Sequence, residues 1–542
     1  MTARALTDGE IPDICVVGAG PLGIALALAC ANEGLSVILL ESGSEQPSLE
    51  KAELSKAELA DPRRHASMDV AVCRALGGTS RWWGGRCVPY DDVDFATRSF
   101  VPNAAWPIDH AEVSQWYEEA AKFFGCEPAR FLVEPVSHID VHFDSLERWA
   151  PVVDMSVRHR AALKEARNLK LLLDATVTEL MINEAGAQVD GLLVRSAAGT
   201  QILRAKRYVL ACGGLETVRT LLVAQRNHPK LFGGKAGLLG VGYMGHISGK
   251  IADLQLTNPS SVSDHDFFVD NGCFARRRFT IDLHAQLREK VLNTAFWIDN
   301  APFYDVSHGN GVLSAVWLAL ASPFGRFLVS PGVRLSHIGP SPRQFWHHVQ
   351  NVFRRPLSTL GSAFEIFQAR FAKLRKPGFL IRNHAGRYAL HYHAEHAPNF
   401  ESRISLAGSA DANGTPRLNI DLKFTNDDVA SVLRTHEILD SSLKETGIGQ
   451  LIYHCPPDRR AASVWDQATD GFHQIGGARM ASSRSDGVVD KNCCIFDLPN
   501  TYIASSCTFP SSSQANPTFL GVALALRLAH HLMRDLSASG HA

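Results

Sequence analysis

Residues 13–23 restrict the possible folds of this chain more than any other stretch. Residues 14–17, Ile-Cys-Val-Val, are wholly apolar, which is typical of a strand buried on both faces of a parallel sheet. Gly18, Gly20 and Gly23 follow in the pattern G-x-G-x-x-G. Gly18 permits a tight turn, Gly20 leaves the backbone open to a phosphate, and Gly23 lets a helix pack close to the strand.

The residues after the turn complete this unit. Residues 24–33 are rich in Ala and Leu and predict a helix, whose free N–H groups and positive dipole end would receive phosphates. Residues 37–40 predict a second strand, and Glu41 ends it, 23 residues beyond Gly18, where an acid binds the ribose hydroxyls of an adenosine. The unit therefore predicts a dinucleotide site, for FAD or for NAD. The alternative is a glycine-rich turn in an ordinary α/β protein.

The composition excludes several classes of protein. The chain has 542 residues, 45% hydrophobic and 20% charged, which suits a globular protein of two large domains. Its formal net charge of −1 gives no reason to expect a nucleic-acid partner. The eleven cysteines form no C-x-x-C pair, so we expect reduced thiols in a cytoplasmic protein and no metal site. Residues 1–10 are polar and predict no signal peptide, and the apolar run 311–321 is too short to span a bilayer.

A second glycine-rich stretch lies at residues 74–87. It contains two tryptophans and four glycines: Trp82, Trp83, Gly77, Gly78, Gly84 and Gly85. This composition predicts a loop rather than a helix or a strand. The glycines would let the backbone approach a flat or bulky group, and the tryptophans would wall a planar ring. The alternative is a glycine-rich surface loop with buried tryptophans.

The middle of the chain changes its pattern. Residues 171–180 and 191–195 predict strands joined by a turn at 184–186, and residues 208–214 predict an apolar strand that ends in glycines. This last strand is similar to the one that returns to the nucleotide sheet in flavoproteins with two dinucleotide domains. The alternating patterns at 250–256 and 388–395, and a turn at 411–416 between two strands, predict an antiparallel sheet.

Residues 342–376 are both basic and aromatic. Apolar residues recur there at helical spacing, namely Phe345, Val349, Val352, Phe353, Phe364, Phe367 and Phe371. Six positive charges accompany them: Arg354, Arg355, Arg370, Lys373, Arg375 and Lys376. One interpretation is an interfacial helix that touches a membrane or a partner. The interpretation that the sequence favours is two helices that pack one face on the domain and leave a solvated basic face.

The carboxy-terminal stretch carries the chemistry. Residues 471–481 read Gly-Phe-His-Gln-Ile-Gly-Gly-Ala-Arg-Met-Ala, and residues 515–521 read Ala-Asn-Pro-Thr-Phe-Leu-Gly. With the first turn, the Gly-Gly-Thr-Ser…Trp-Gly-Gly loop and Glu395…Pro398…Ser402-Arg403, these motifs resemble the glucose-methanol-choline (GMC) flavoprotein oxidoreductases over nearly the whole chain. Cys493-Cys494 and residues 514–518 resemble the sugar-oxidising, pyranose-oxidase-like branch.

The resemblance implies FAD as cofactor. In the pyranose-oxidase branch a histidine of the glycine-rich loop carries a covalent bond to the flavin. The matching position here is Trp82 and the loop has no histidine, so we expect non-covalent FAD. By position, the resemblance implies that FAD is held by Gly18, Gly20, Pro21, Leu22, Gly23, Glu41, Gly78, Thr79, Ser80, Trp82, Trp83, Gly84, Gly85, Val177, Gly213, Ser505, Pro517 and Thr518. Ser505 departs from the acid that many members have there, and Val177 matches the position whose backbone meets the adenine.

The same resemblance implies that His473 and Asn516 lie at the flavin ring. Oxidation of an alcohol removes a hydroxyl proton and a hydride, so a proton acceptor must lie within hydrogen-bond reach of the hydroxyl. Histidine is suited to this role because it titrates near the working pH. Asn516 precedes Pro517, so its backbone is held extended and its amide can orient the same hydroxyl.

These observations predict an α/β protein with a Rossmann-type FAD-binding domain and a second, α+β substrate domain with an antiparallel sheet. Residues 1–250 would form the first part of a discontinuous FAD domain, 251–460 the substrate domain, and 461–542 a part that returns to the FAD domain with the catalytic residues.

The predicted activity is that of an FAD-dependent dehydrogenase or oxidase acting on the CH–OH group of a sugar, glycoside or polyol. His473 would take the proton, Asn516 would orient the oxygen, and flavin N5 would receive the hydride. O2 or an unknown redox partner would accept the electrons. The alternatives are a flavin monooxygenase or amine oxidase, an NAD-dependent dehydrogenase, and a non-catalytic flavin-binding or membrane-associated partner protein.

Overall fold

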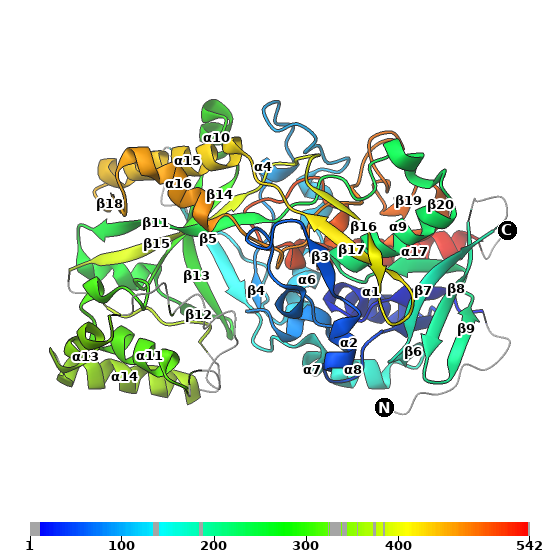
Figure 1. The fold of residues 1–542 in the computed structure, drawn as a ribbon, viewed down its shortest axis with the longest axis horizontal. Coiled ribbons are helices and arrows are strands. Elements are labelled where there is room, and N and C mark those ends of the chain that lie inside the picture. The colour runs from blue at the N-terminus through cyan, green and yellow to red at the C-terminus, as the bar shows by residue number, and fades with distance from the viewer. Residues whose placement is uncertain are drawn as a thin grey trace.

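The computed structural model arranges the chain around two large sheets at opposite ends of an elongated molecule (Figure 1). It describes residues 11–133, 140–183, 188–323, 325, 338, 344–354, 356–371, 376–382 and 385–539. The turn expected at 184–186 lies outside these residues.

The first sheet is the one that the amino-terminal motif predicts. Its strands lie in the order β19-β20-β10-β1-β2-β6, and all neighbours are parallel except β19 and β20. They are β1 (Ile14–Val17), β2 (Val37–Leu40), β6 (Leu169–Leu172), β10 (Arg207–Leu210), β19 (Cys494–Ile495) and β20 (Leu498–Ile503). All residues of β1 and β2 are buried, which explains their continuous apolar composition. The sheet thus joins pieces from both ends of the chain.

Long helices accompany this sheet. α1 (Pro21–Asn32) starts three residues before the Ala- and Leu-rich run, because proline suits the first position of a helix. α17 (Pro517–Ser539) packs along α1, and α9 (Gly214–Asn227) follows β10 (Figure 1). A small antiparallel meander stands beside them, made of β7 (Thr176–Ile182), β8 (Val189–Ser196) and β9 (Gly199–Leu203).

The second large sheet is antiparallel, as the alternating patterns predict. Its order is β18-β11-β15-β14-β13-β5-β4, with β12 beside β13. The strands are β4 (Arg86–Cys87), β5 (Val141–Trp149), β11 (His246–Leu256), β12 (Phe268–Asp270), β13 (Cys273–Ile281), β14 (Thr294–Asp299), β15 (Arg387–Glu395) and β18 (Gly449–Tyr453). The helices at this end are α10 (Leu283–Glu289), α15 (Asn426–Glu445) and α16 (Pro457–Gln467) (Figure 1).

Sheet membership does not follow the predicted domain boundary at residue 250. Strands β4 and β5 come from the first 150 residues of the chain but pair within the antiparallel sheet. β16 (Arg403–Ala410) and β17 (Pro416–Asp421) form the expected hairpin, yet β17 also pairs in parallel with β3 (Ala57–Leu59). Strands β3, β4 and β5, from the first 150 residues, therefore pair with strands from the middle of the chain or lie in one sheet with them. The division into 1–250, 251–460 and 461–542 stays a prediction.

Short helices connect the sheets. They are α2 (Leu49–Glu53), α3 (Met68–Ala71), α4 (Asp92–Phe95), α5 (His110–Ser114), α6 (Tyr117–Phe124), α7 (Met155–Arg158) and α8 (Arg160–Glu165). Three further helices project at one corner beyond the antiparallel sheet (Figure 1), namely α11 (Gly311–Ala321), α13 (Phe345–Arg354) and α14 (Pro356–Phe371). Among the described helices, none has the length and apolar character needed to cross a bilayer.

Candidate active site

The first glycine turn has two tight positions and one open position. A Cβ at Gly18, where φ is +106°, would lie 2.4 Å from the Ala211 carbonyl oxygen. A Cβ at Gly23 would lie 1.9 Å from the Gly18 carbonyl oxygen. At Gly20, which caps α1, a Cβ would meet no atom within 4 Å. The outer glycines therefore serve packing, while Gly20 exposes backbone at a helix amino terminus, where a phosphate binds.

Glu41 lies at the end of β2, as predicted, and it is buried. Its carboxylate accepts hydrogen bonds from the backbone N–H groups of Ala19, at 2.9 Å, and Gly43, at 2.8 Å. Burial raises the pKa of Glu41, and these two donors oppose the shift. A carboxylate has about four lone-pair sites, so each oxygen can still accept a bond from a ribose hydroxyl.

The second glycine loop is in contact with the first. The backbone N–H of Gly77 donates to the Ala19 oxygen at 2.8 Å, and a Cβ at Gly78 would lie 3.0 Å from the Cα of Gly20. The Ser80 hydroxyl donates to the Gly77 oxygen at 2.6 Å, and the Thr79 hydroxyl accepts from the backbone N–H of Cys73 at 3.1 Å. Two stretches that are distant in sequence thus form one glycine-lined cradle.

The two tryptophans of this loop have different surroundings. Trp82 is 46% exposed. Trp83 donates from Nε1 to the Val153 oxygen at 2.7 Å and packs against Phe124 at a centroid distance of 5.5 Å. Trp83 therefore anchors the loop to the protein. The prediction that both tryptophans wall a planar ring stays a prediction.

Four predicted cofactor residues follow neighbouring parallel strands. Gly18 and Glu41 come directly after β1 and β2, Gly213 comes after β10, and Ser505 comes after β20. Because the carboxyl ends of parallel strands meet at one edge, these residues lie along the edge where such sheets bind ligands. Val177 lies in β7, whose Thr176 bonds to Ser42 beside Glu41 at 2.7 Å. Pro517 and Thr518 open α17.

The two predicted catalytic residues are in contact. The Nδ2 atom of Asn516 lies 2.8 Å from Nε2 of His473, although 43 residues separate them. His473 retains 21% of its side-chain exposure. Gly476 and Gly477 after it have φ values of +78° and +95°, so the chain can turn there where other residues would be strained.

Asp470 fixes the orientation of the His473 ring. Its Oδ2 atom lies 3.1 Å from Nδ1 of His473, and Oδ1 accepts the backbone N–H groups of Phe472 and His473 at 2.9 and 3.1 Å. Burial by itself would raise the pKa of Asp470, but His473 and His246 outweigh it and hold the pKa well below its usual range. The carboxylate is therefore ionised and keeps the His473 proton on Nδ1, which leaves a lone pair on Nε2.

Arg86 fixes the orientation of the Asn516 amide. It follows the second glycine loop in β4, and its Nη1 donates to Oδ1 of Asn516 at 2.9 Å. Its Nε pairs with the fully buried Glu147, and its guanidinium lies over the Trp297 ring at 4.5 Å. Since the amide oxygen faces Arg86, the amide N–H₂ must face His473. A hydrogen-bonded row thus runs from Asp470 through His473 and Asn516 to Arg86.

Two more histidines face His473. The ring centroids of His246 and His393 lie 4.7 and 5.4 Å from that of His473. Burial lowers the pKa of both, and for His393 the neighbouring His246 adds to the effect, so both rings are neutral. His393 donates from Nδ1 to the Gln514 oxygen at 2.6 Å, which leaves a lone pair on Nε2. The three imidazoles offer nitrogens within 4.8 Å of one another, a spacing that could hold a metal, whereas the sequence predicted none.

Comparisons with known proteins relate part of this chain to one described family. Residues 398–525, which contain both His473 and Asn516, match the family described as GMC oxidoreductase. Paromamine 6'-oxidase of Streptomyces fradiae is 21% identical, over 98% of this chain and 92% of its own length. 2-Methyl-1,2-propanediol dehydrogenase of Mycolicibacterium austroafricanum is 19% identical, over 98% and 97%. The carboxy-terminal block of the chain is thus similar to the GMC oxidoreductases.

A solved structure confirms the fold class. Formate oxidase of Aspergillus oryzae superposes with a TM-score of 0.52 at 15% identity, covering 98% of this chain and 99% of that one. The predicted combination of a dinucleotide-binding α/β part and an antiparallel sheet is therefore correct.

Several residues of this candidate site escaped the sequence reasoning. Asp470 and Arg86 carried a local signal, because Asp470 stands three residues before His473 and Arg86 directly follows Gly84 and Gly85. His246 and His393 carried none, because each is one of 23 histidines and occupies an ordinary strand position. Their proximity to His473 arises only when β11 and β15 pair.

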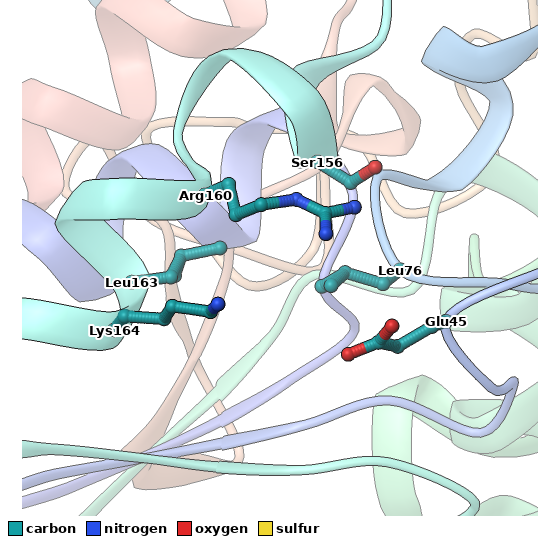
Figure 2. Close-up of a pocket in the computed structure, with 6 residues that line it drawn as sticks. All are labelled: Glu45, Leu76, Ser156, Arg160, Leu163 and Lys164. Carbon is teal, nitrogen blue, oxygen red and sulfur yellow. The ribbon is translucent and has the colours of Figure 1, made fainter. Parts of the chain in front are cut away.

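A small pocket lies outside this site. It is lined by Glu45, Leu76, Ser156, Arg160, Leu163 and Lys164, which Figure 2 shows as sticks. Arg160 and Lys164 come from α8, and Glu45 from the segment after Glu41. It contains neither His473 nor any predicted cofactor residue, so it plays no part in the arrangement described above.

Proposed function

We propose that this GMC oxidoreductase oxidises the CH–OH group of a small alcohol, with FAD as the electron acceptor inside the protein. The observation that carries the proposal is the Asp470–His473–Asn516–Arg86 row. It presents an unprotonated imidazole nitrogen and an amide N–H₂ group side by side, 2.8 Å apart. An alcohol oxygen needs such a pair, an acceptor for its proton and a donor for its lone pair.

The residues at the strand ends fit FAD. The backbone at Gly20, Gly84 and Gly213 is open, since a Cβ at any of them would meet no atom within 4 Å. The first two glycine loops touch each other, and Glu41 lies where the ribose would be held. Because the loop at 74–87 has no histidine, the cofactor would be dissociable. When bound, FAD supplies a two-electron acceptor for the hydride of the substrate carbon.

The side chains suggest how the proton moves. The substrate hydroxyl would enter between Nε2 of His473 and Nδ2 of Asn516 and take over both bonds. His473 would accept the hydroxyl proton at Nε2, and the ionised Asp470 would stabilise the resulting imidazolium through Nδ1. Arg86 would keep the Asn516 amide turned toward the substrate oxygen.

The substrate class is a sugar, glycoside or polyol. The names of the two relatives above support it, because one is named for the oxidation of paromamine at its 6' position and the other for a propanediol. One is an oxidase and the other a dehydrogenase, so O2 and a separate redox partner are both proposed acceptors. All eleven cysteines are free, which supports the proposed cytoplasmic location.

Anaerobic reduction of the bound flavin tests the proposal. Purified protein reconstituted with FAD is mixed with a panel of sugars, glycosides and polyols, and the flavin absorbance is followed. We expect bleaching by at least one member and slow or no bleaching by the same compound with the His473→Ala variant. Bleaching by amines instead, or equal rates for both proteins, would contradict the proposed chemistry.

A further inference from the structure

Helices α13 and α14 carry a group of exposed apolar side chains. The residues of this hairpin patch are Trp346, Phe353, Leu357, Leu360 and Phe364, and their exposed fractions run from 60% to 84%. Trp346 and Phe353 are seven residues apart on α13, and Leu357, Leu360 and Phe364 follow the spacing i, i+3, i+7 on α14. Residues at these spacings share one face of a helix, so each helix presents an apolar stripe to solvent.

The burial pattern of α13 is the reverse of that of an ordinary surface helix. The residues it buries are polar: His348 stacks on Trp317 at 4.0 Å, and Asn351 donates to the Val306 oxygen at 3.0 Å. Its aromatic residues Trp346 and Phe353 point outward. The polar contacts hold α13 against α11, so the outer aromatic residues contribute little to packing and are free to bind something else.

The charge of this segment is also unusual. Residues 341–382 contain eight Lys or Arg residues and one acidic residue, Glu365, in a chain whose formal net charge is −1. Arg354 at the end of α13 and Arg382 are exposed. In the sequence, positive charge is therefore concentrated in the segment that contains the hairpin patch, while the rest of the chain carries a net negative charge. Figure 1 shows that α13 and α14 lie at a corner of the molecule, away from the nucleotide sheet.

We propose that the hairpin patch docks the protein on an anionic lipid surface. Exposed Trp, Phe and Leu side chains would enter the boundary between headgroups and acyl chains, and the surrounding Arg and Lys residues would attract anionic headgroups. A second copy of the chain fits less well, because two such patches would bring like charges together. The protein would bind the surface without spanning it. The inference does not rest on the proposed oxidation.

Vesicle sedimentation of the full, FAD-loaded chain tests this inference. We expect binding to phosphatidylcholine vesicles that contain phosphatidylglycerol, no binding to vesicles of phosphatidylcholine alone, and weaker binding at high salt. The variant Leu357→Glu should lower the partition onto anionic vesicles about tenfold. The matched control is Leu49→Glu, since Leu49 is 92% exposed and Leu357 84% exposed, each near the start of a helix.

Three results would overturn the inference. They are equal binding to neutral and anionic vesicles, equal loss of binding by the two variants, and light-scattering evidence that the protein is a dimer which Leu357→Glu dissociates. Melting temperature and FAD content of both variants should match the unmodified protein, because both leucines are exposed. Flavin reduction by a soluble alcohol is measured on the same samples, so a failure of the oxidation proposal is seen separately.

Discussion

The glycine turn at residues 18–23 and the cluster formed by Asp470, His473, Asn516 and Arg86 are built in opposite ways. The turn uses backbone and glycine, and its tight positions are set by contacts of 1.9 and 2.4 Å that a Cβ would make. The cluster uses side chains that orient one another by hydrogen bonds, from Asp470 to His473 within one loop and on to Asn516 and Arg86 from distant parts of the chain. A change in the turn should therefore remove the cofactor, whereas a change in the cluster should remove the reaction and leave the cofactor bound.

The largest expected effect comes from a methyl group in the turn. Gly23→Ala places a Cβ 1.9 Å from the Gly18 oxygen, so the strand and helix must separate, at a cost of about 1–3 kcal/mol. We expect loss of FAD and a lower melting temperature by thermal denaturation. Gly20→Ala is the control, because its Cβ meets no protein atom and should weaken FAD binding without changing the melting temperature of the FAD-free protein.

The proposed general base, His473, gives the next largest effect. His473→Ala should lower kcat by about 10²–10⁴, the usual contribution of a general base. Because His473 is not part of the glycine cradle, the ratio of FAD to protein should stay constant in absorbance spectra. A variant that keeps full activity, or one that loses FAD together with activity, would remove the contrast between the two regions.

Arg86 tests whether the orientation of Asn516 matters. Arg86→Lys keeps the positive charge but cannot bond to Asn516 and Glu147 at the same time, because lysine lacks the guanidinium fork. We expect kcat to fall by about tenfold through misplacement of the amide, with FAD retained. Steady-state kinetics beside Asn516→Ala provide the check, since the two changes should not add if they act through the same bond.

We expect Asp470 to contribute to the free energy of unfolding as well as to the orientation of His473. Its folded-state pKa lies below the unfolded value of about 3.9, so its contribution is present above that pH and is lost as the pH falls through the folded value. Asp470→Asn should lower the free energy of unfolding at pH 7 by about 1–3 kcal/mol. Denaturant titrations should show this gap constant from neutral pH to about pH 5 and smaller below about pH 4. A gap that widens in acid would contradict the assignment.

The sequence predicted correctly those strands whose formation depends on residues close together in the chain. The strands at 14–17 and 37–40 have the predicted bounds, because buried apolar runs are readable in the sequence. The sequence also favoured a hairpin segment that packs an apolar face inward. The structure shows the opposite for α13, because Asn351 and His348 find buried polar partners on α11 and nearby loops.

The sequence by itself determined the nucleotide turn, the strand-end acid Glu41 and, through resemblance, the pairing of His473 with Asn516. These signals are short and the residues of each motif are contiguous or nearly so. Only the tertiary structure brought His246 and His393 to His473 and Arg86 to Asn516, because β4, β11 and β15 belong to one sheet although they come from distant parts of the chain. Which strands of such a sheet become neighbours depends on contacts between residues far apart in the sequence, and a one-residue shift in register would turn these side chains to the other face.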